Sequence, residues 1–363
     1  MNLLNYGNLK KIVQEELEHL TAISVSDRPW EMPLAAALSS GLPLLISVYF
    51  NHLGEGLVSS MGGLVFLYLP NTPMHHRMTF LMACAFGVIS CFTLGLVGHF
   101  FPLAMVPGLA FLAVLATMIC RFYRVGPPGS LFFVMAASIG LYMPIEPAQI
   151  PFQIGLVSMG CFWATLIGFL YSAYMLRLRT PNPAPRLHHP TFGYVVFDSV
   201  VIGLCVAISL AIAQFFDLSR PYWVPVSCLA VVQGVTLRAV WNKQLHRILG
   251  TVLGILFSWA LLSISMDALS LAILMMALMF VIESLVIRHY GLAVIFITPL
   301  TILLVEAAHL SDYSATLIIQ ARVVDTILGS LMGLVGGICI HNPVIRSALE
   351  TKLKLLVPPR FIH

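Results

Sequence analysis

Apolar residues fill most of the chain in long runs, and such runs are typical of helices that cross a lipid bilayer. Polar and charged residues gather in the short segments between the runs. Several runs are shorter than the roughly 20 residues that a span requires. The run at 222–236 contains Pro225 and Gly234, which favour a tilted or broken helix. The cores of the twelve runs are residues 34–50, 56–70, 78–98, 101–120, 129–145, 150–175, 194–216, 222–236, 248–265, 268–287, 291–309 and 314–340.

A separate segment, residues 1–33, precedes the first run. It places apolar residues at helical spacing from Leu9 to Leu20, among lysines and glutamates. This spacing predicts an amphipathic helix that lies against the other helices or against lipid headgroups.

A proline-rich, charged segment at 177–190 divides the runs into two groups of six. The groups stay in phase at an offset of 167 residues, which places Arg121 over Arg288. Since six is even, both groups have the same orientation and are related by a pseudo-two-fold axis along the membrane normal. The sequence therefore predicts an all-α polytopic membrane protein with about twelve transmembrane helices, arranged as two parallel six-helix repeats. Its expected divisions are an N-terminal segment 1–33, a first membrane half 34–176, a linker 177–193, a second membrane half 194–341 and a tail 342–363.

The second half contains a shorter internal likeness. Arg247-Ile-Leu-Gly-Thr-Val-Leu-Gly254 is similar to Arg322-Val-Val-Asp-Thr-Ile-Leu-Gly329. These segments lie three spans apart and so have opposite orientations. Either a finer inverted repeat or chance explains the likeness.

The composition agrees with a membrane protein, because 59% of the residues are hydrophobic, 9% are charged and the mean hydropathy is +0.94. The seven cysteines are scattered singly within apolar runs, which indicates packing residues and not disulfides or metal ligands. The chain contains no phosphate-binding loop, dinucleotide fingerprint, HExxH or GxSxG motif. The sequence thus favours neither an enzyme nor ATP-driven transport, and no cofactor is expected.

The basic residues predict an orientation. If the twelve spans alternate, every lysine and arginine except Arg220 and Arg322 falls on one side of the membrane. The positive-inside rule then places both termini in the cytoplasm. The formal charge of +4 is explained by this distribution, so nucleic acid is not an expected partner.

The last run carries two charges, Arg322 and Asp325, which share a helix face and can form an ion pair. The same face repeats small residues at every fourth position, which suits close helix packing. Either the pair is structural and allows a polar helix to be buried, or Arg322 binds a carboxylate and Asp325 exchanges a proton. Gln320 stands beside them as a further polar group or as a helix cap.

Four other charged residues are candidates. Arg121 and Arg288 end matching runs, where they either anchor the helices at the cytoplasmic face or form a ring of positive potential for anions. Glu283 precedes Arg288 by about one turn and is a candidate partner for it and for protons. Glu306, near the outer end of its run, is either interfacial or part of a proton relay.

Aromatic residues stand at the start of the run at 222–236. Tyr222 and Trp223 fit either an aromatic belt at the membrane surface or a stacking surface for an aromatic substrate at the outer mouth. His75, His76 and Arg77 are interpreted as a cytoplasmic loop that contacts headgroups, not as a metal site.

Three segments of the second half, at 220–225, 247–254 and 322–329, resemble the pattern of the fusaric acid resistance and aromatic acid exporter family. In the first half only the span layout fits, since His52-Leu-Gly-Glu-Gly56 stands where Arg-Pro-Tyr-Trp is expected. The resemblance implies a bacterial inner-membrane protein that exports aromatic carboxylic acids, is driven by protons and works with a periplasmic adaptor. Many members carry a large cytoplasmic domain between the halves, which the short linker here replaces. The likeness extends to plant aluminium-activated malate channels, in which six-span subunits pair around a basic pore.

The resulting hypothesis is a secondary transporter that exports organic, especially aromatic, carboxylates by proton exchange. Arg322 would bind the anion, Asp325 would exchange the proton, and Tyr222 and Trp223 would flank the exit. The alternatives are a passive anion channel and a membrane scaffold whose charges are structural. The expected partners are the organic anion, membrane lipids, an adaptor protein and a second copy of the chain.

Overall fold

The computed structural model describes residues 21, 23–25, 28–184, 193–264, 266–306 and 315–356. All regular structure in these residues is helical, as the runs predict. The amphipathic helix expected within residues 1–20 lies outside them. The helices are α2 (Glu31–Tyr49), α3 (Leu53–Gly63), η1 (Leu64–Tyr68), α4 (Met74–Gly98), η2 (Pro102–Ala104), α5 (Met105–Phe122), α6 (Leu131–Tyr142), η3 (Pro147–Gln149), α7 (Ile150–Leu178), η4 (Gly193–Phe197), α8 (Asp198–Phe215), α9 (Trp223–Val232), α10 (Leu237–Leu262), α11 (Ala268–Leu285), α12 (Tyr290–Glu306), α13 (Ala315–His341) and α14 (Pro343–Leu356).

The helices fall into two length classes. Among the described residues, eight helical segments are long and apolar enough to cross a membrane. Four shorter apolar helices accompany them, at Leu53–Tyr68, Leu131–Tyr142, Trp223–Val232 and Tyr290–Leu304. The run at 222–236 is one of these, since α9 has ten residues and all ten are buried. The chain is therefore a membrane protein with many apolar helices.

Each short helix packs against a long helix, and glycines allow the two backbones to approach closely. On α7, a side chain at Gly160 would collide with the backbone of Ser59 in α3. On α13, Gly329 meets the carbonyl of Val224 in α9 in the same way. The pairs α4 with α6 and α10 with α12 are likewise in extensive contact. Small residues thus bring the backbones close enough to bury the short helices.

This packing predicts a specific stability effect. We expect Gly329→Ala to lower the free energy of unfolding by about 1–3 kcal/mol, because the added methyl group has no space beside the backbone of α9. Thermal unfolding of the purified protein in detergent measures this loss of stability. Gly108→Ala in α5 is the matched control, since a side chain there meets open space. Equal melting temperatures for both variants would contradict this account of the α9 and α13 contact.

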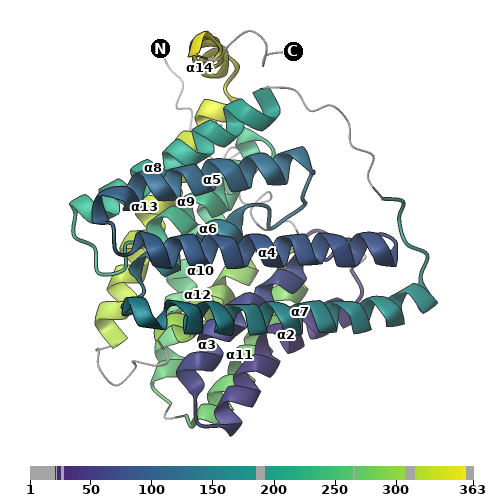
Figure 1. The fold of residues 1–363 in the computed structure, drawn as a ribbon. Helices are drawn as coiled ribbons and strands as arrows, with labels where there is room; N and C mark the ends of the chain where they lie inside the picture. Colours follow the sequence, from purple (N-terminus) through teal and green to yellow (C-terminus); the bar gives the residue numbers. More distant parts are fainter. Residues whose placement is uncertain are drawn as a thin grey trace, which may run out of the picture.

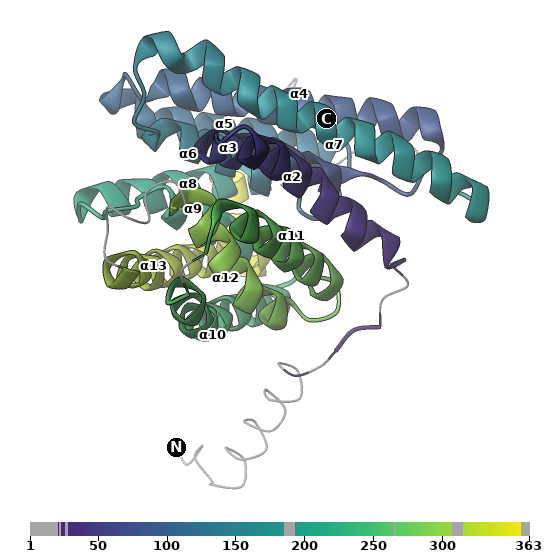
Figure 2. The same ribbon diagram turned by 90° about the horizontal axis from the view of Figure 1, so that it is seen from below.

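Helices α2–α7 lie on one side of the molecule and α8–α13 on the other, as Figure 2 shows, whereas the two groups overlap in the view of Figure 1. The most extensive contacts between the sides are those of α5 with α8 and of α2 with α11. Ion pairs reinforce both joints. Arg121 pairs with Asp198, at 2.6 Å, and Arg28 pairs with Glu283, at 2.8 Å.

Candidate functional site

The polar face of α13 is buried inside the protein. Arg322, Asp325, Thr326 and Ser330 recur at spacings of three and four residues, which places them along one side of the helix. Their exposed fractions are 5%, 1%, 1% and 0%. Each carries at least one buried nitrogen or oxygen with no hydrogen-bond partner in the structure. Since buried polar groups are normally paired, this face is organised to meet something polar.

Arg322 reaches away from its own helix. Its Nη2 atom donates a hydrogen bond to Thr301 Oγ1 on α12, at 2.9 Å. Its guanidinium lies over the ring of Trp223, with the central carbon 3.9 Å from the ring centre. The Nε and Nη1 atoms have no partner. The contacts hold the guanidinium in place while two of its nitrogens remain available to an anion.

The ion pair expected between Arg322 and Asp325 is not formed. Both carboxylate oxygens of Asp325 lack a hydrogen-bond partner. The reason is that Arg322 extends to Trp223 and Thr301 on neighbouring helices, contacts that spacing along α13 does not reveal. The positive charges of Arg322 and Arg220 still attract the Asp325 carboxylate electrostatically. Asp325 is thus a buried acid in a positive field without a direct partner.

A second buried arginine, Arg247 on α10, was missed as a site residue. It is only 6% exposed, although the charge distribution placed it on the cytoplasmic side. Its Nη2 donates to Ser227 Oγ at 3.2 Å and its Nη1 to the hydroxyl of Tyr290 at 3.3 Å, while Nε has no partner. The likeness between the segments at 247–254 and 322–329 was the signal that could have identified it.

These two segments occupy equivalent environments. A side chain at Gly254 would meet the carbonyl of Ile295 and the side chain of Thr298 on α12. A side chain at Gly329 would meet the carbonyl of Val224 and the side chain of Ser227 on α9. Ile295 and Thr298 are three residues apart, as are Val224 and Ser227. The sequence likeness therefore corresponds to one packing arrangement used twice.

Tyr222 and Trp223 are buried, with 6% and 4% of their surfaces exposed, so neither forms an aromatic belt at a membrane surface. The main-chain carbonyl of Tyr222 accepts a hydrogen bond from Ser138 on α6. Its ring contacts the ring of Tyr142. These contacts come from the first half, so Tyr222 and Trp223 lie where the halves meet and beside Arg322.

The remaining predicted residues lie outside this cluster. Arg121 pairs with Asp198, and Arg346 approaches the same carboxylate at 3.0 Å. Glu283 pairs with Arg28 and not with Arg288, whose side chain is exposed. Gln320 is exposed, so it does not stand beside the buried pair. The side chain of Glu306 lies outside the described part of the structure.

The expected loop at His75, His76 and Arg77 is instead the first turn of α4. Arg77 is buried, and its Nε donates to the carbonyl of Thr72 at 2.6 Å. It therefore fixes the start of the helix. Within the described residues, no three histidine, cysteine, aspartate or glutamate side chains gather where they could bind a metal ion.

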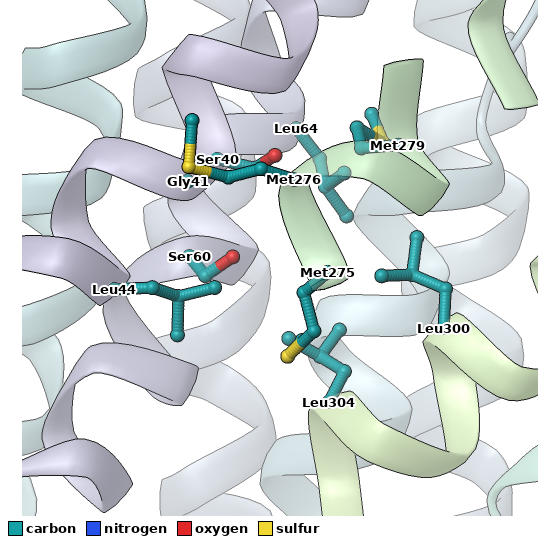
Figure 3. Close-up of a pocket in the computed structure, with 10 residues that line it drawn as sticks. All are labelled: Ser40, Gly41, Leu44, Ser60, Leu64, Met275, Met276, Met279, Leu300 and Leu304. Carbon is teal, nitrogen blue, oxygen red and sulfur yellow. The ribbon is translucent and has the colours of Figure 1, made fainter. Parts of the chain in front are cut away.

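Two cavities in the described structure could have formed the expected conduit. One holds about 20 Å³ and is lined by methionine, leucine and serine side chains from α2, α3, α11 and α12 (Figure 3). The other holds about 450 Å³ and lies in the first half. Neither borders Arg322 or Asp325. The expected conduit beside Arg322 is thus not formed by either cavity, and the buried face of α13 is closed off in this conformation.

Comparisons with known proteins agree with the family resemblance. Residues 206–336, from α8 into α13, match the family described as fusaric acid resistance protein-like. The uncharacterised membrane protein YvaC of Bacillus subtilis (strain 168) is 21% identical over 457 aligned positions, which cover 85% of this chain and 72% of YvaC. That alignment is longer than the chain, so YvaC contains inserted residues without a counterpart here. No solved structure matches the chain. The predicted resemblance is confirmed, and the matched region contains the buried Arg247 and Arg322.

Proposed function

We propose that the protein is a secondary transporter that exports organic, especially aromatic, carboxylates across a bacterial cytoplasmic membrane. The observation that carries this proposal is the buried guanidinium of Arg322, with two unpartnered nitrogens beside the aromatic ring of Trp223. A fork of charged donors fits a carboxylate, and an adjacent aromatic surface fits the ring of an aromatic acid.

The architecture that we propose for this activity has twelve membrane helices in two parallel halves, α2–α7 and α8–α13. Packing supports it, because corresponding pairs are in contact in each half. The pairs α3 with α7 and α4 with α6 correspond to α9 with α13 and α10 with α12. The main contacts between the halves also correspond. If the two halves are exchanged, the contact of α5 with α8 becomes the contact of α11 with α2. A substrate path is expected where such repeats meet, beside their short helices.

Local packing also supports a finer inverted repeat within the second half. Gly250 and Gly254 on α10 contact successive segments of α12, at Gly291 and Val294 and then at Ile295 and Thr298. Gly329 and Gly333 on α13 contact successive segments of α9. The second half divides into two three-helix units, α8–α10 and α11–α13. In each case the third helix of one unit packs in parallel against the second helix of the other unit. When two such units exchange conformations, a central site becomes exposed first to one side of the membrane and then to the other.

The charges near α9 favour an anion. Arg322 and Arg247 are buried and close enough to influence one another electrostatically, and Asp325 is the acid that acts on Arg322. Two guanidinium groups and one carboxylate leave a net positive charge. The amino-terminal end of α9, at Trp223, adds the positive end of a helix dipole beside Arg322. A substrate carboxylate would balance this excess.

Asp325 supplies a linkage between protons and substrate. An ionised Asp325 shares the positive field of Arg322 and repels a second carboxylate nearby. Protonation removes this repulsion, so the proton and the anion influence one another's binding. Through this linkage, a pH difference across the membrane can act on carboxylate transport.

The proposed orientation has both termini in the cytoplasm. Although Arg77 and Arg247 are buried in helices, the other basic residues, apart from Arg220 and Arg322, still fall on one side if twelve spans alternate. The ion pairs of Arg121 and of Glu283 would then lie toward the cytoplasmic side.

Transport into and out of proteoliposomes tests the proposed function. Liposomes loaded with 4-hydroxybenzoate are diluted into medium with or without an imposed pH difference, and protein-free liposomes give the passive leak. We expect protein-dependent efflux that saturates with substrate and changes with the pH difference. Efflux that ignores the pH difference but follows voltage with high unitary conductance would instead indicate an anion channel.

A further inference from the structure

The cavity of about 450 Å³ in the first half has the size of a small-molecule site. It opens between the end of η1, the start of α4 and the end of α5. Its lining includes four aromatic rings, those of Tyr68, Phe80, Phe122 and Tyr123. It is separate from the buried face of α13, because neither Arg322 nor Asp325 lines it.

The apolar wall of the cavity is held in place by partners behind it. The hydroxyl of Tyr68 donates to the carbonyl of Gly129 at 2.8 Å, so the ring, with its polar atom satisfied, faces the space as apolar surface. Tyr68 also packs against Phe132 and Phe133 on α6. A flat apolar group entering the cavity therefore meets a fixed aromatic surface.

Two polar groups stand in the same lining. The ring of His76 stacks on Phe80, and its Nδ1 is bonded to Thr72 Oγ1 at 2.9 Å, which leaves Nε2 for a ligand. Arg124 is exposed and lines the cavity beside Tyr123. A few polar groups on an aromatic wall are the usual arrangement for an amphipathic small molecule.

The backbone at Arg124 supports a role for its side chain. Its φ is +51°, in the left-handed region, where it closes the end of α5 by donating to the carbonyl of Arg121. The other non-glycine residues with positive φ in the described chain are Asn51 and Asp217, both of which tolerate this conformation better. Arg124 thus ends α5 within the lining of the cavity and places a positively charged side chain there.

We propose that this cavity is a second binding site for an aromatic carboxylate, with the ring against Tyr68 and Phe80 and the carboxylate on Arg124. The inference rests on the proposed function for its substrate class and adds an entry site to it. Arg124 lies one turn after Arg121, at the end of the molecule that the charge distribution places in the cytoplasm. A substrate would bind here before it reaches Arg322.

A glycine in the lining allows the cavity to be filled. An added side chain at Gly126 meets no atom within 4 Å, and its backbone is not in the left-handed region. Gly126→Leu should therefore add a bulky side chain at the lining without displacing a neighbour. Gly108→Leu, also in open space but at the other end of α5, is the matched control.

The test is ¹⁹F NMR titration of 4-fluorobenzoate with the purified full-length protein in phosphatidylcholine nanodiscs. We expect saturable binding that persists in Arg322→Gln and Gly108→Leu, weakens roughly tenfold in Arg124→Gln and is lost at this site in Gly126→Leu. Cyclohexanecarboxylate, which lacks the aromatic ring, should compete poorly.

Two results would overturn the proposal. The first is binding in the Arg322→Gln background that is equally tight with and without Arg124→Gln. The second is displacement of the probe when phosphatidylglycerol replaces part of the phosphatidylcholine, because the cavity would then hold an anionic lipid. If binding to the cavity persists but proteoliposomes show no transport, the proposed function fails while the binding site stands.

Discussion

Replacing Arg322 with glutamine should lower carboxylate transport about tenfold or more without destabilising the protein. The substitution removes the charged fork that we assign to the substrate, and the loss of a charge-assisted contact worth roughly 1.5–3 kcal/mol lowers binding about tenfold to a hundredfold. Stability should not fall, because the buried guanidinium leaves Nε and Nη1 unpartnered in the folded protein. The loss of its contact with Trp223 works in the opposite direction. Transport in proteoliposomes and thermal unfolding of the same preparation measure the two effects.

Arg322→Lys is the matched variant for this experiment. Lysine keeps the charge but not the planar fork, so we expect partial transport with a raised KM. If Arg322 served only to stabilise the bundle, Arg322→Gln would instead lower the melting temperature and leave transport per folded molecule unchanged. That outcome would favour the membrane-scaffold alternative.

Asp325→Asn should make carboxylate transport independent of the pH difference across the membrane. In the wild type, carboxylate binding weakens as the pH rises and Asp325 ionises, because two negative charges then share the field of Arg322. Asparagine imitates the protonated acid at every pH. The variant should therefore bind carboxylate independently of pH, about as tightly as the wild type does at low pH, and its transport should not respond to a pH difference.

Titration of 4-fluorobenzoate at several pH values measures this effect, and the Gly126→Leu background removes the contribution of the first-half cavity. Glu283→Gln is the control, since Glu283 is a buried acid whose partner is Arg28 at the joint between the halves. A pH profile that is unchanged in Asp325→Asn but altered in Glu283→Gln would transfer the proton role to Glu283.

The sequence predicts the helical class and the burial of the charges on α13 because both follow from local pattern. It misplaces Arg247 because a run of apolar residues marks only the apolar part of a helix. The run begins at 248, whereas α10 begins at Leu237 and carries Arg247 well inside it. The same effect converts the expected loop at Arg77 into the first turn of α4.

The partners of the charged residues could not be predicted from spacing. Arg322 and Asp325 are correctly placed on one helix, but the contacts with Trp223 and Thr301 compete with their pairing and come from other helices. Glu283 and Arg28 are 255 residues apart in the sequence. The burial of Tyr222 likewise depends on α6, which belongs to the other half. These features arise only when the two halves come together.

We propose that the polar face of α13 lines the path of the substrate, although this face is closed in this conformation. Thiol labelling during transport tests whether water reaches it. Thr326 is 1% exposed with an unpartnered hydroxyl, whereas its neighbour Ile327 is 38% exposed on the outer face of the helix. The native cysteines are buried or half-buried, so the wild type gives the background.

The measurement is the rate at which a small, membrane-impermeant methanethiosulfonate reagent modifies Thr326→Cys in transporting proteoliposomes, with Ile327→Cys as control. We expect that Thr326→Cys reacts, that 4-hydroxybenzoate slows the reaction, and that Ile327→Cys, which we expect to face lipid, does not react. A Thr326→Cys thiol that remains as unreactive as Ile327→Cys, with or without substrate, would show that no aqueous path reaches α13 and would contradict the account.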